Sequence, residues 1–250
     1  MIEQDALASF GPFFAVKTHT GTAGPTPGAP WRSMGDLVTD PAGLAARVAQ
    51  VRDALTASAS AWPDEIELRV AASVAHLGLT ARLVAPVLGL AVLGDADPAI
   101  DLAEVYWQAE LGGPFPLSLP GYLLASRQSR PGPLRSPAAA PHVLRTFLEG
   151  PALALVQTTL LVTSFAPHVL WGNVASAVHS AGQMIRIARP EFGQRVTGVV
   201  DEALAHPLLR NEHHRPGGKF RRRSCCLIYR ISAPGPIGVR GLCGDCVLAA

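Results

Sequence analysis

All four cysteines of this 250-residue chain lie within its last 26 residues. They are Cys225, Cys226, Cys243 and Cys246. The spacing is an adjacent pair, then sixteen residues, then C-x-x-C. Gly244, inside the C-x-x-C, permits a tight turn that brings the last two sulfurs to one centre. In a reducing compartment disulfides are uncommon, so thiols clustered in this way indicate metal binding or redox chemistry.

The segment that carries the cysteines is also the basic part of the chain. Residues 210–250 contain eight lysine and arginine residues and two acidic residues, a net charge of +6, so residues 1–209 carry −4 of the chain's total of +2. Nearby cations stabilise thiolates and offset the charge of a four-thiolate centre. Arg221, Arg222 and Arg223 would be a solvated basic edge if they stood alone, but beside four thiols they indicate charge compensation. The positive charge is confined to one end and lacks interleaved aromatic residues, so we expect no nucleic-acid partner.

Three kinds of centre are compatible with the four thiols. A structural zinc site usually uses two separated C-x-x-C turns. Adjacent side chains in extended backbone point to opposite faces, so Cys225 and Cys226 suit a single zinc ion less well than a two-iron cluster. A dithiol oxidoreductase built on Cys243 and Cys246 would normally accompany a βαβ pattern, which this sequence lacks. The residues favour an iron–sulfur cluster and leave zinc and dithiol chemistry open.

The rest of the chain predicts a mainly α fold with minor β. Hydrophobic residues make up 48% and charged residues 16%, which excludes a disordered chain. Apolar residues at helical spacing predict helices that begin near Pro41 and near Pro63, a helix over 142–165 that Pro167 ends or restarts, a second helix that runs on towards Ile185, and an amphipathic helix over 191–205. We expect a helical body over residues 1–209 and a cluster-binding segment over 210–250, together forming one structural domain.

Prolines and glycines predict where regular structure stops. Pro86 is expected to break the apolar run Leu79–Leu93, and the prolines of residues 20–31 predict a loop. Residues 102–109 are expected to form a short helix. Seven prolines within residues 111–141 exclude a continuous helix and leave a short strand within 115–124.

We expect no stable membrane insertion. The long segment between Glu149 and Arg186 has no charged residue, but polar residues interrupt it and its apolar runs are shorter than the roughly 20 residues of a membrane span. It is therefore interpreted as buried core helix. The first five residues lack the basic start and apolar run of an export signal, so we expect a cytoplasmic protein.

Two stretches resemble one family of redox proteins. Arg222–Arg230 followed by Leu242–Cys246 resembles the C-terminal signature of the FhuF-like ferric siderophore reductases, whose pattern is C-C-x10-C-x2-C. Leu170–Ala177 contains a Trp-Gly-Asn sequence that looks like the family's W-G-N motif. The spacer here is sixteen residues, and the extra ones fall in the turn-rich stretch 232–238. A surface loop lengthens at small entropic cost, so ligation is expected to survive the insertion.

The resemblance implies a [2Fe-2S] cluster held by Cys225, Cys226, Cys243 and Cys246. It implies an oxidoreductase that reduces siderophore-bound Fe(III) to Fe(II) by one-electron transfer and releases the iron, with no catalytic residue beyond the cluster. No dinucleotide or P-loop fingerprint is present, so the electron would come from an external donor such as a ferredoxin, a flavodoxin or a reductase. Two alternatives remain: a structural zinc module with four cysteine ligands, whose basic segment binds a partner, and an iron–sulfur electron carrier without a siderophore site.

Five further residues are candidates for contact with the cluster or the substrate. They are Trp171, Asn173, Arg222, Arg223 and Tyr229. Trp171 is equally interpretable as an ordinary buried aromatic residue, and Tyr229 is expected on a strand that leaves Cys226. Among the histidines, His213 and His214 are expected in an exposed loop, and His168 and His179 are expected to be buried and hydrogen-bonded.

Overall fold

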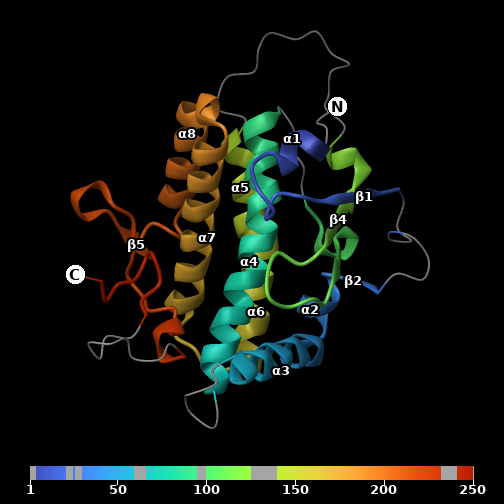
Figure 1. Ribbon diagram of the computed structural model, residues 1–250, viewed down its shortest axis with the longest axis vertical. Helices are drawn as coiled ribbons and strands as arrows, with labels where there is room; N and C mark the ends of the chain where they lie inside the picture. Colours follow the sequence, from blue (N-terminus) through green and yellow to red (C-terminus); the bar gives the residue numbers. More distant parts are fainter. Residues whose placement is uncertain are drawn as a thin grey trace.

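The computed structural model describes residues 4–20, 25, 30–58, 66–94, 100–124, 140–231 and 241–249. The fold is mainly α with a small mixed sheet (Figure 1). The helices are α1 (Gln4–Ala8), α2 (Asp36–Thr39), α3 (Pro41–Ser58), α4 (Leu68–Leu93), α5 (Ala140–Phe147), α6 (Leu153–Val162), α7 (Pro167–Ala188) and α8 (Gly193–Ala205). A π-helical turn, Leu148–Ala152, joins α5 to α6. The prediction of a mainly α fold is confirmed.

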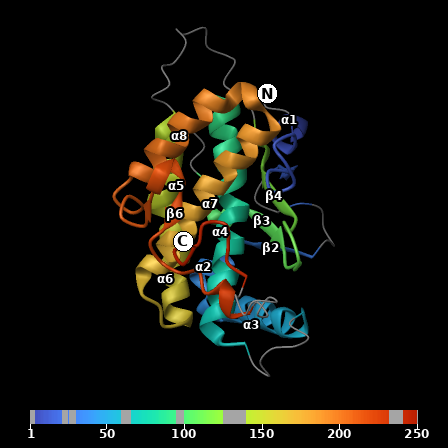
Figure 2. The same ribbon diagram turned by 60° about the vertical axis from the view of Figure 1, so that its left-hand side comes forward.

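Helix α4 is the centre of the molecule. It packs against α7, α3, α5 and α8, and in Figures 1 and 2 it stands between the α7–α8 pair and the sheet. Every residue from Arg82 to Val92 is buried, so this part of the helix has no solvent-exposed face. Among the described residues, α4 is the one helix long and apolar enough to cross a membrane. Because 78% of its most apolar window is buried inside the fold, it resembles the core helix of a soluble protein.

The four-stranded sheet lies on one side of α4. Its strands are β1 (Lys17–His19), β2 (Trp31–Ser33), β3 (Tyr106–Gln108) and β4 (Leu117–Pro120), in the order β1-β4-β3-β2. β1 is parallel to β4, and the other two pairs are antiparallel. Arg82 joins α4 to the segments that precede β1 and β4. Its guanidinium group donates hydrogen bonds to the carbonyl oxygens of Phe13, Ala15 and Phe115.

Most of the predicted helices are present. The apolar stripes of α3 and α8 face the core, and Pro167 occupies the first turn of α7, where proline is favourable. The strand expected within 115–124 is β4. Residues 59–65 lie outside the described part of the chain, and α4 begins at Leu68 rather than near Pro63. Most of the loop predicted over 20–31 also lies outside it.

Two local predictions are wrong. Pro86 does not break the helix but lies inside α4, where close packing on all sides offsets a cost of about 3 kcal/mol for an interior proline. The short helix expected over 102–109 is a 3-10 turn, Leu102–Glu104, followed by β3. Val105, Tyr106 and Trp107 favour extended backbone, and pairing with β2 and β4 stabilises it.

Candidate metal centre

A short hairpin presents the cysteine segment to the helices. Strands β5 (His213–His214) and β6 (Arg221–Arg222) pair antiparallel. Gly217 and Gly218 have positive φ, which allows the turn between the strands. In Figure 1 this hairpin and the C-terminus lie on the α7–α8 side of the molecule, away from the sheet.

Backbone contacts hold the two halves of the cysteine motif side by side. The N–H of Arg222 in β6 donates to the carbonyl oxygen of Asp245, and Arg221 Nη1 donates to the carbonyl oxygen of Gly244 at 2.7 Å. Ser176 of α7 donates its hydroxyl proton to Asp245 Oδ2 at 2.6 Å. These bonds fix the C-x-x-C turn against both β6 and α7, although sixteen residues separate the two cysteine pairs.

The sulfurs meet across this junction. Cys226 Sγ and Cys243 Sγ are 3.4 Å apart and share a hydrogen bond. Two ligands of one tetrahedral metal ion, each about 2.3 Å from the metal, lie about 3.8 Å apart, so the observed separation is close to that of neighbouring ligands. The backbone N–H groups of Leu227 and Leu248 donate to Cys225 Sγ and Cys246 Sγ, each at 3.3 Å. Such N–H···S bonds tune thiolate clusters.

The sulfurs of Cys226 and Cys243 are in contact, but the four cysteines do not form a closed set of metal ligands. All four cysteines are free thiols. Within the described ranges, no group of three or more His, Cys, Asp and Glu side chains is close enough together to hold a metal ion. The donor set fits a four-thiolate centre in number and chemistry, but cysteine side chains would have to move to bring all four sulfurs to one centre.

The electrostatics of the sulfurs follow from burial and from a buried cation. Cys226 and Cys246 are buried, whereas Cys225 and Cys243 are partly exposed. The hydrogen bond with Cys243, together with backbone N–H groups and the nearby Arg222 charge, lowers the pKa of Cys226 to about 6. The same bond and burial raise the pKa of Cys243, and burial raises the pKa of Cys225. One thiolate is thus favoured in the Cys226–Cys243 pair at neutral pH.

Arg222 is the cation beneath these sulfurs. Its side chain is 1% exposed, and Nη2 donates to the carbonyl oxygen of Val169 in α7. Nε has no hydrogen-bond partner in the described part of the chain. Burial lowers the pKa of Arg222 below its usual value, and the negative charges of the cysteines and of Asp245 offset part of this effect. Arg222 therefore supplies the buried positive charge that a group of thiolates requires.

The Trp-Gly-Asn sequence lies directly against the cysteine segment. A Cβ atom on Gly172 of α7 would be 2.3 Å from Ser224 Oγ and 3.0 Å from Arg222 Nη2. Ser224 Oγ also donates to the carbonyl oxygen of His168, one turn before Gly172. The glycine is thus the position at which β6 and the residue before Cys225 approach α7, so the two stretches that carry the family resemblance are in contact.

Asn173, the residue after Gly172, is linked to Cys226 by hydrogen bonds through Ser73 of α4. Its Nδ2 donates to the carbonyl oxygen of Ser73 at 3.1 Å and lies 3.4 Å from His76 Nδ1. Ser73 Oγ in turn donates to the carbonyl oxygen of Cys226 at 2.9 Å. Ser73 and His76 were not predicted, because neither lies in a motif and only the packing of α4 on α7 brings them to the site.

This network contains unsatisfied buried atoms. Asn173 Oδ1 and His76 Nε2 have no partner among the described residues. Burial, followed by the charge of Arg222, lowers the pKa of His76 to about 3, so the imidazole is neutral in the folded protein. Together with Arg222 Nε, these atoms are three unpartnered polar atoms beneath the cysteines. Buried polar groups without a partner are uncommon in proteins, so each of these atoms requires an explanation.

The other predicted residues are further from the sulfurs or differently placed. Trp171 is 8% exposed and packs in the main core, which fits its interpretation as a buried aromatic residue. Arg223 is exposed and donates to the carbonyl oxygen of His213. The strand expected at Tyr229 is wrong: Leu227 has φ +67°, which ends any extended run, and Ile228–Arg230 forms a 3-10 turn. Arg230 of that turn pairs with Glu67.

The histidines differ from the prediction in their burial and in the elements that carry them. His214 is exposed, but His213 is half-buried in β5 rather than in a loop. Its ring is stacked on Phe220 at 5.3 Å, and the ring of His179 is stacked on the same phenylalanine at 4.3 Å. Burial lowers the pKa of both histidines. His168 is exposed, so the expectation that it is buried is wrong.

No protein-family model matches the sequence, and searches of curated proteins and of solved structures found no match either. The likeness to the FhuF-like family therefore rests on the two stretches quoted above and on their contact in the fold.

Proposed function

We propose that this protein is a cytoplasmic [2Fe-2S] oxidoreductase that reduces siderophore-bound Fe(III) to Fe(II). One observation carries the proposal. The sulfurs of Cys226 and Cys243, from the two halves of the motif, are 3.4 Å apart, and Ser224, the residue before Cys225, packs closely on Gly172 of α7. The contact between the cysteine segment and the Trp-Gly-Asn sequence supports a shared role for the two stretches.

The chain's own residues would provide the surroundings of the cluster. Cys225, Cys226, Cys243 and Cys246 would be its ligands, and when bound it would supply a one-electron carrier. Arg222 would offset part of the negative charge, and the burial of Cys226 and Cys246 would exclude water from that side of the cluster. The partly exposed Cys225 and Cys243 mark the side open to partners. No acid–base residue is required, because the reaction transfers only an electron.

The proposed reaction balances with an external donor. One electron from a reduced ferredoxin, flavodoxin or reductase converts the ferric chelate to Fe(II) and free siderophore. Siderophores bind through hard oxygen ligands, which hold Fe(III) much more tightly than Fe(II), so reduction weakens the chelate and releases the iron. The ferric siderophore is the substrate and leaves no group on the protein.

The first experiment is metal and sulfide analysis of anaerobically purified protein, with absorption spectra before and after dithionite. We expect about two irons and about two sulfides per chain and a visible band that bleaches on reduction. The Cys226→Ala and Cys243→Ala variants should lose the iron and the band. One zinc per chain with no sulfide and no colour would disprove the reductase and identify a structural zinc module.

A second measurement separates a reductase from an electron carrier. Dithionite-reduced protein is mixed anaerobically with ferric hydroxamate, catecholate and carboxylate chelates, and Fe(II) is trapped with a coloured chelator. We expect reoxidation of the protein with formation of one Fe(II) per electron for at least one chelate class. A cluster that stays reduced with all three would make the protein an electron carrier without a siderophore site.

A further inference from the structure

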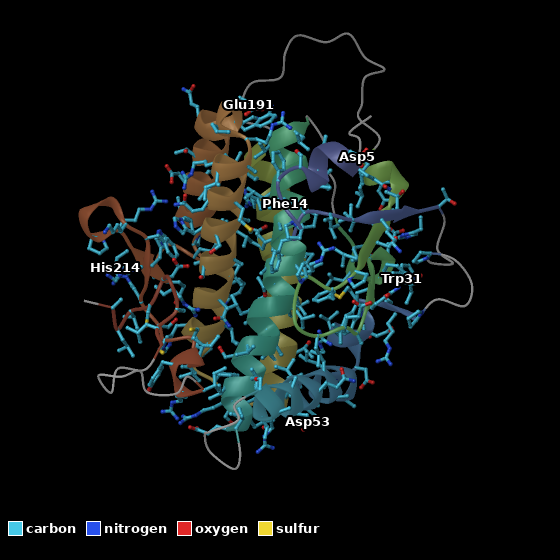
Figure 3. All side chains as sticks on the ribbon, viewed as in Figure 1. Asp5, Phe14, Trp31, Asp53, Glu191 and His214 are labelled. Carbon is cyan, nitrogen blue, oxygen red and sulfur yellow. The ribbon has the colours of Figure 1, made fainter. Side chains whose placement is uncertain are left out.

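A cavity with both apolar and polar lining residues lies on the opposite side of the molecule from the cysteines. It has a volume of about 130 Å³ and lies between α3 and the edge formed by β2 and β3. Figure 3 labels Trp31, the first residue of β2, and His214 of the cysteine segment on opposite sides of the molecule. A cavity of this size has room for several water molecules, and so for a carboxylate or phosphate group. Its polar lining includes Arg32, Ser33, Asp36, Arg47, Gln50 and Trp107.

Arg47 is the unusual residue of this lining. It is 6% exposed, and its guanidinium group lies 5.0 Å from the ring centre of Trp107 and 5.7 Å from that of Phe115. Nη2 donates to the carbonyl oxygen of Glu110 at 2.6 Å, but Nη1 has no hydrogen-bond partner among the described residues. Burial lowers its pKa, yet a guanidinium group stays charged at neutral pH. Arg47 is therefore a buried cation with an unused donor at a cavity wall.

Arg82 shows how this fold satisfies an arginine that has only a structural role. Arg82 is 2% exposed, and each of its three guanidinium nitrogens donates to a backbone carbonyl oxygen. Arg82 does not line the cavity. All three guanidinium nitrogens of Arg82 have acceptors, whereas Nη1 of Arg47 is buried without one, and Arg47 also belongs to the lining of the cavity.

The remaining lining residues favour an anionic group. Trp107 is 2% exposed, and its Nε1–H is a second donor without a partner in the described part of the chain. Arg32, which is exposed, adds a positive charge, and Asp36, also exposed, adds a negative one. The two arginines and one aspartate leave a net charge of +1 on the lining. Guanidinium groups donate paired N–H···O bonds to carboxylates and phosphates. A cationic ligand has no acceptor oxygens for these donors and would be repelled by their charge.

We infer that this cavity binds a small oxyanionic group, a carboxylate or a phosphate, with Arg47 as the main positioning cation. Because Nη1 is itself buried, the guanidinium group must turn to present it to the ligand oxygen, and the exposed Arg32 of the lining adds a second positive charge. The site is independent of the cysteines, so it does not depend on the proposed reductase activity.

The test uses the full-length protein as purified and follows the indole N–H signal of Trp107 by two-dimensional ¹H–¹⁵N NMR. The chain has four tryptophans, so the signal is assigned by its loss in Trp107→Phe. Inorganic phosphate and acetate are titrated separately against chloride at matched ionic strength. We expect a saturable shift of the Trp107 signal with at least one of the two anions, and the anion that saturates identifies the source of the group.

Two variants make the result specific. Arg47→Gln should weaken binding at least tenfold, because it removes a charged hydrogen-bond donor from a buried site. Arg52→Gln, on the same helix but outside the cavity lining, should leave the affinity unchanged. If Arg47→Gln is unfolded by circular dichroism, Arg47→Lys, which keeps the charge but loses the forked donor, should bind several-fold more weakly. A shift with neither anion, or an equal affinity in the Arg47 and Arg52 variants, would overturn the proposal.

Discussion

Two arginines, Arg82 and Arg222, are almost completely buried, and they differ in how far the fold satisfies them. Arg82, on the sheet side of α4, has three backbone carbonyl acceptors and joins segments that are distant in the sequence. Arg222, on the cysteine side, has Val169 as a carbonyl acceptor and an Nε without a described partner, and the anionic groups that act on it are cysteine sulfurs and the Asp245 carboxylate. The first arrangement is complete within the fold. The buried charge of Arg222 is compensated only when the neighbouring sulfurs carry negative charge. Arg222 is therefore suited to a thiolate or metal site rather than to a purely structural contact.

The largest effect is expected from Arg82→Met. The variant removes a buried cation and leaves three carbonyl oxygens without this donor, those of the buried Phe115, the partly buried Phe13 and the exposed Ala15. The free energy of unfolding should therefore fall by about 3 kcal/mol or more. Chemical denaturation at pH 7 measures this change. Arg69→Met, on the same helix at a residue whose side chain is 48% exposed, should cost about 0.5 kcal/mol or less. Equal losses in the two variants would show that Arg82 is not a structural fastener.

Gly172→Ala tests the cysteine side of the comparison. The new methyl group would meet Ser224 Oγ and Arg222 Nη2, so the cysteine segment must move away from α7. We expect a loss of about 2 kcal/mol in stability and a clear fall in bound iron per chain. Gly78→Ala, on α4, is the matched control because no described atom lies within 4 Å of its Cβ position. That change should stabilise the helix by about 0.5–1 kcal/mol and leave the metal content unchanged.

Local sequence patterns predicted some elements of the fold and missed others. Helices α3 and α8 were predicted because their apolar residues recur at helical spacing, a local property. Pro86 inside α4 and the strand at Tyr106–Gln108 were missed because packing on all sides and pairing with two other strands decide them. Those contacts join residues far apart in the sequence, so no local pattern records them.

The candidate site divides in the same way. The four cysteines, Arg222 and Asn173 stand in motifs and were predicted from residue type and spacing. Ser73 and His76 became part of the site only through the packing of α4 against α7. The turn at Leu227 replaced an expected strand, and the positive φ of a non-glycine residue there is not recorded in the residue pattern. A motif therefore predicts ligands better than it predicts the residues that support them.

His76, on the same side as Arg222, gives a pH-dependent test. Its pKa is about 3 in the folded protein and about 6.5 in the unfolded chain, so between these values only the unfolded chain binds the proton. Stability is therefore lost as the pH falls below about 6.5, and at pH 5 the loss is about 2 kcal/mol. Denaturation at pH 7 and pH 5 should show this loss in the wild type, and His76→Leu should lose about 2 kcal/mol less between the same two pH values. Identical pH dependence in both proteins would contradict a buried neutral histidine.

The smallest effect separates Arg222 from its exposed neighbour and rests on the proposed cluster. Arg222→Gln removes a buried positive charge near the sulfurs, so a reduced, more negative cluster should become harder to form. We expect the reduction potential to fall by about 60 mV, the equivalent of a tenfold change in the equilibrium constant of a one-electron couple. Arg223→Gln removes the same charge from an exposed position, where solvent screens it, and should change the potential much less. Potentiometric titration of both variants measures the difference. Equal shifts would mean that the net charge of the segment, rather than the buried position of Arg222, sets the potential.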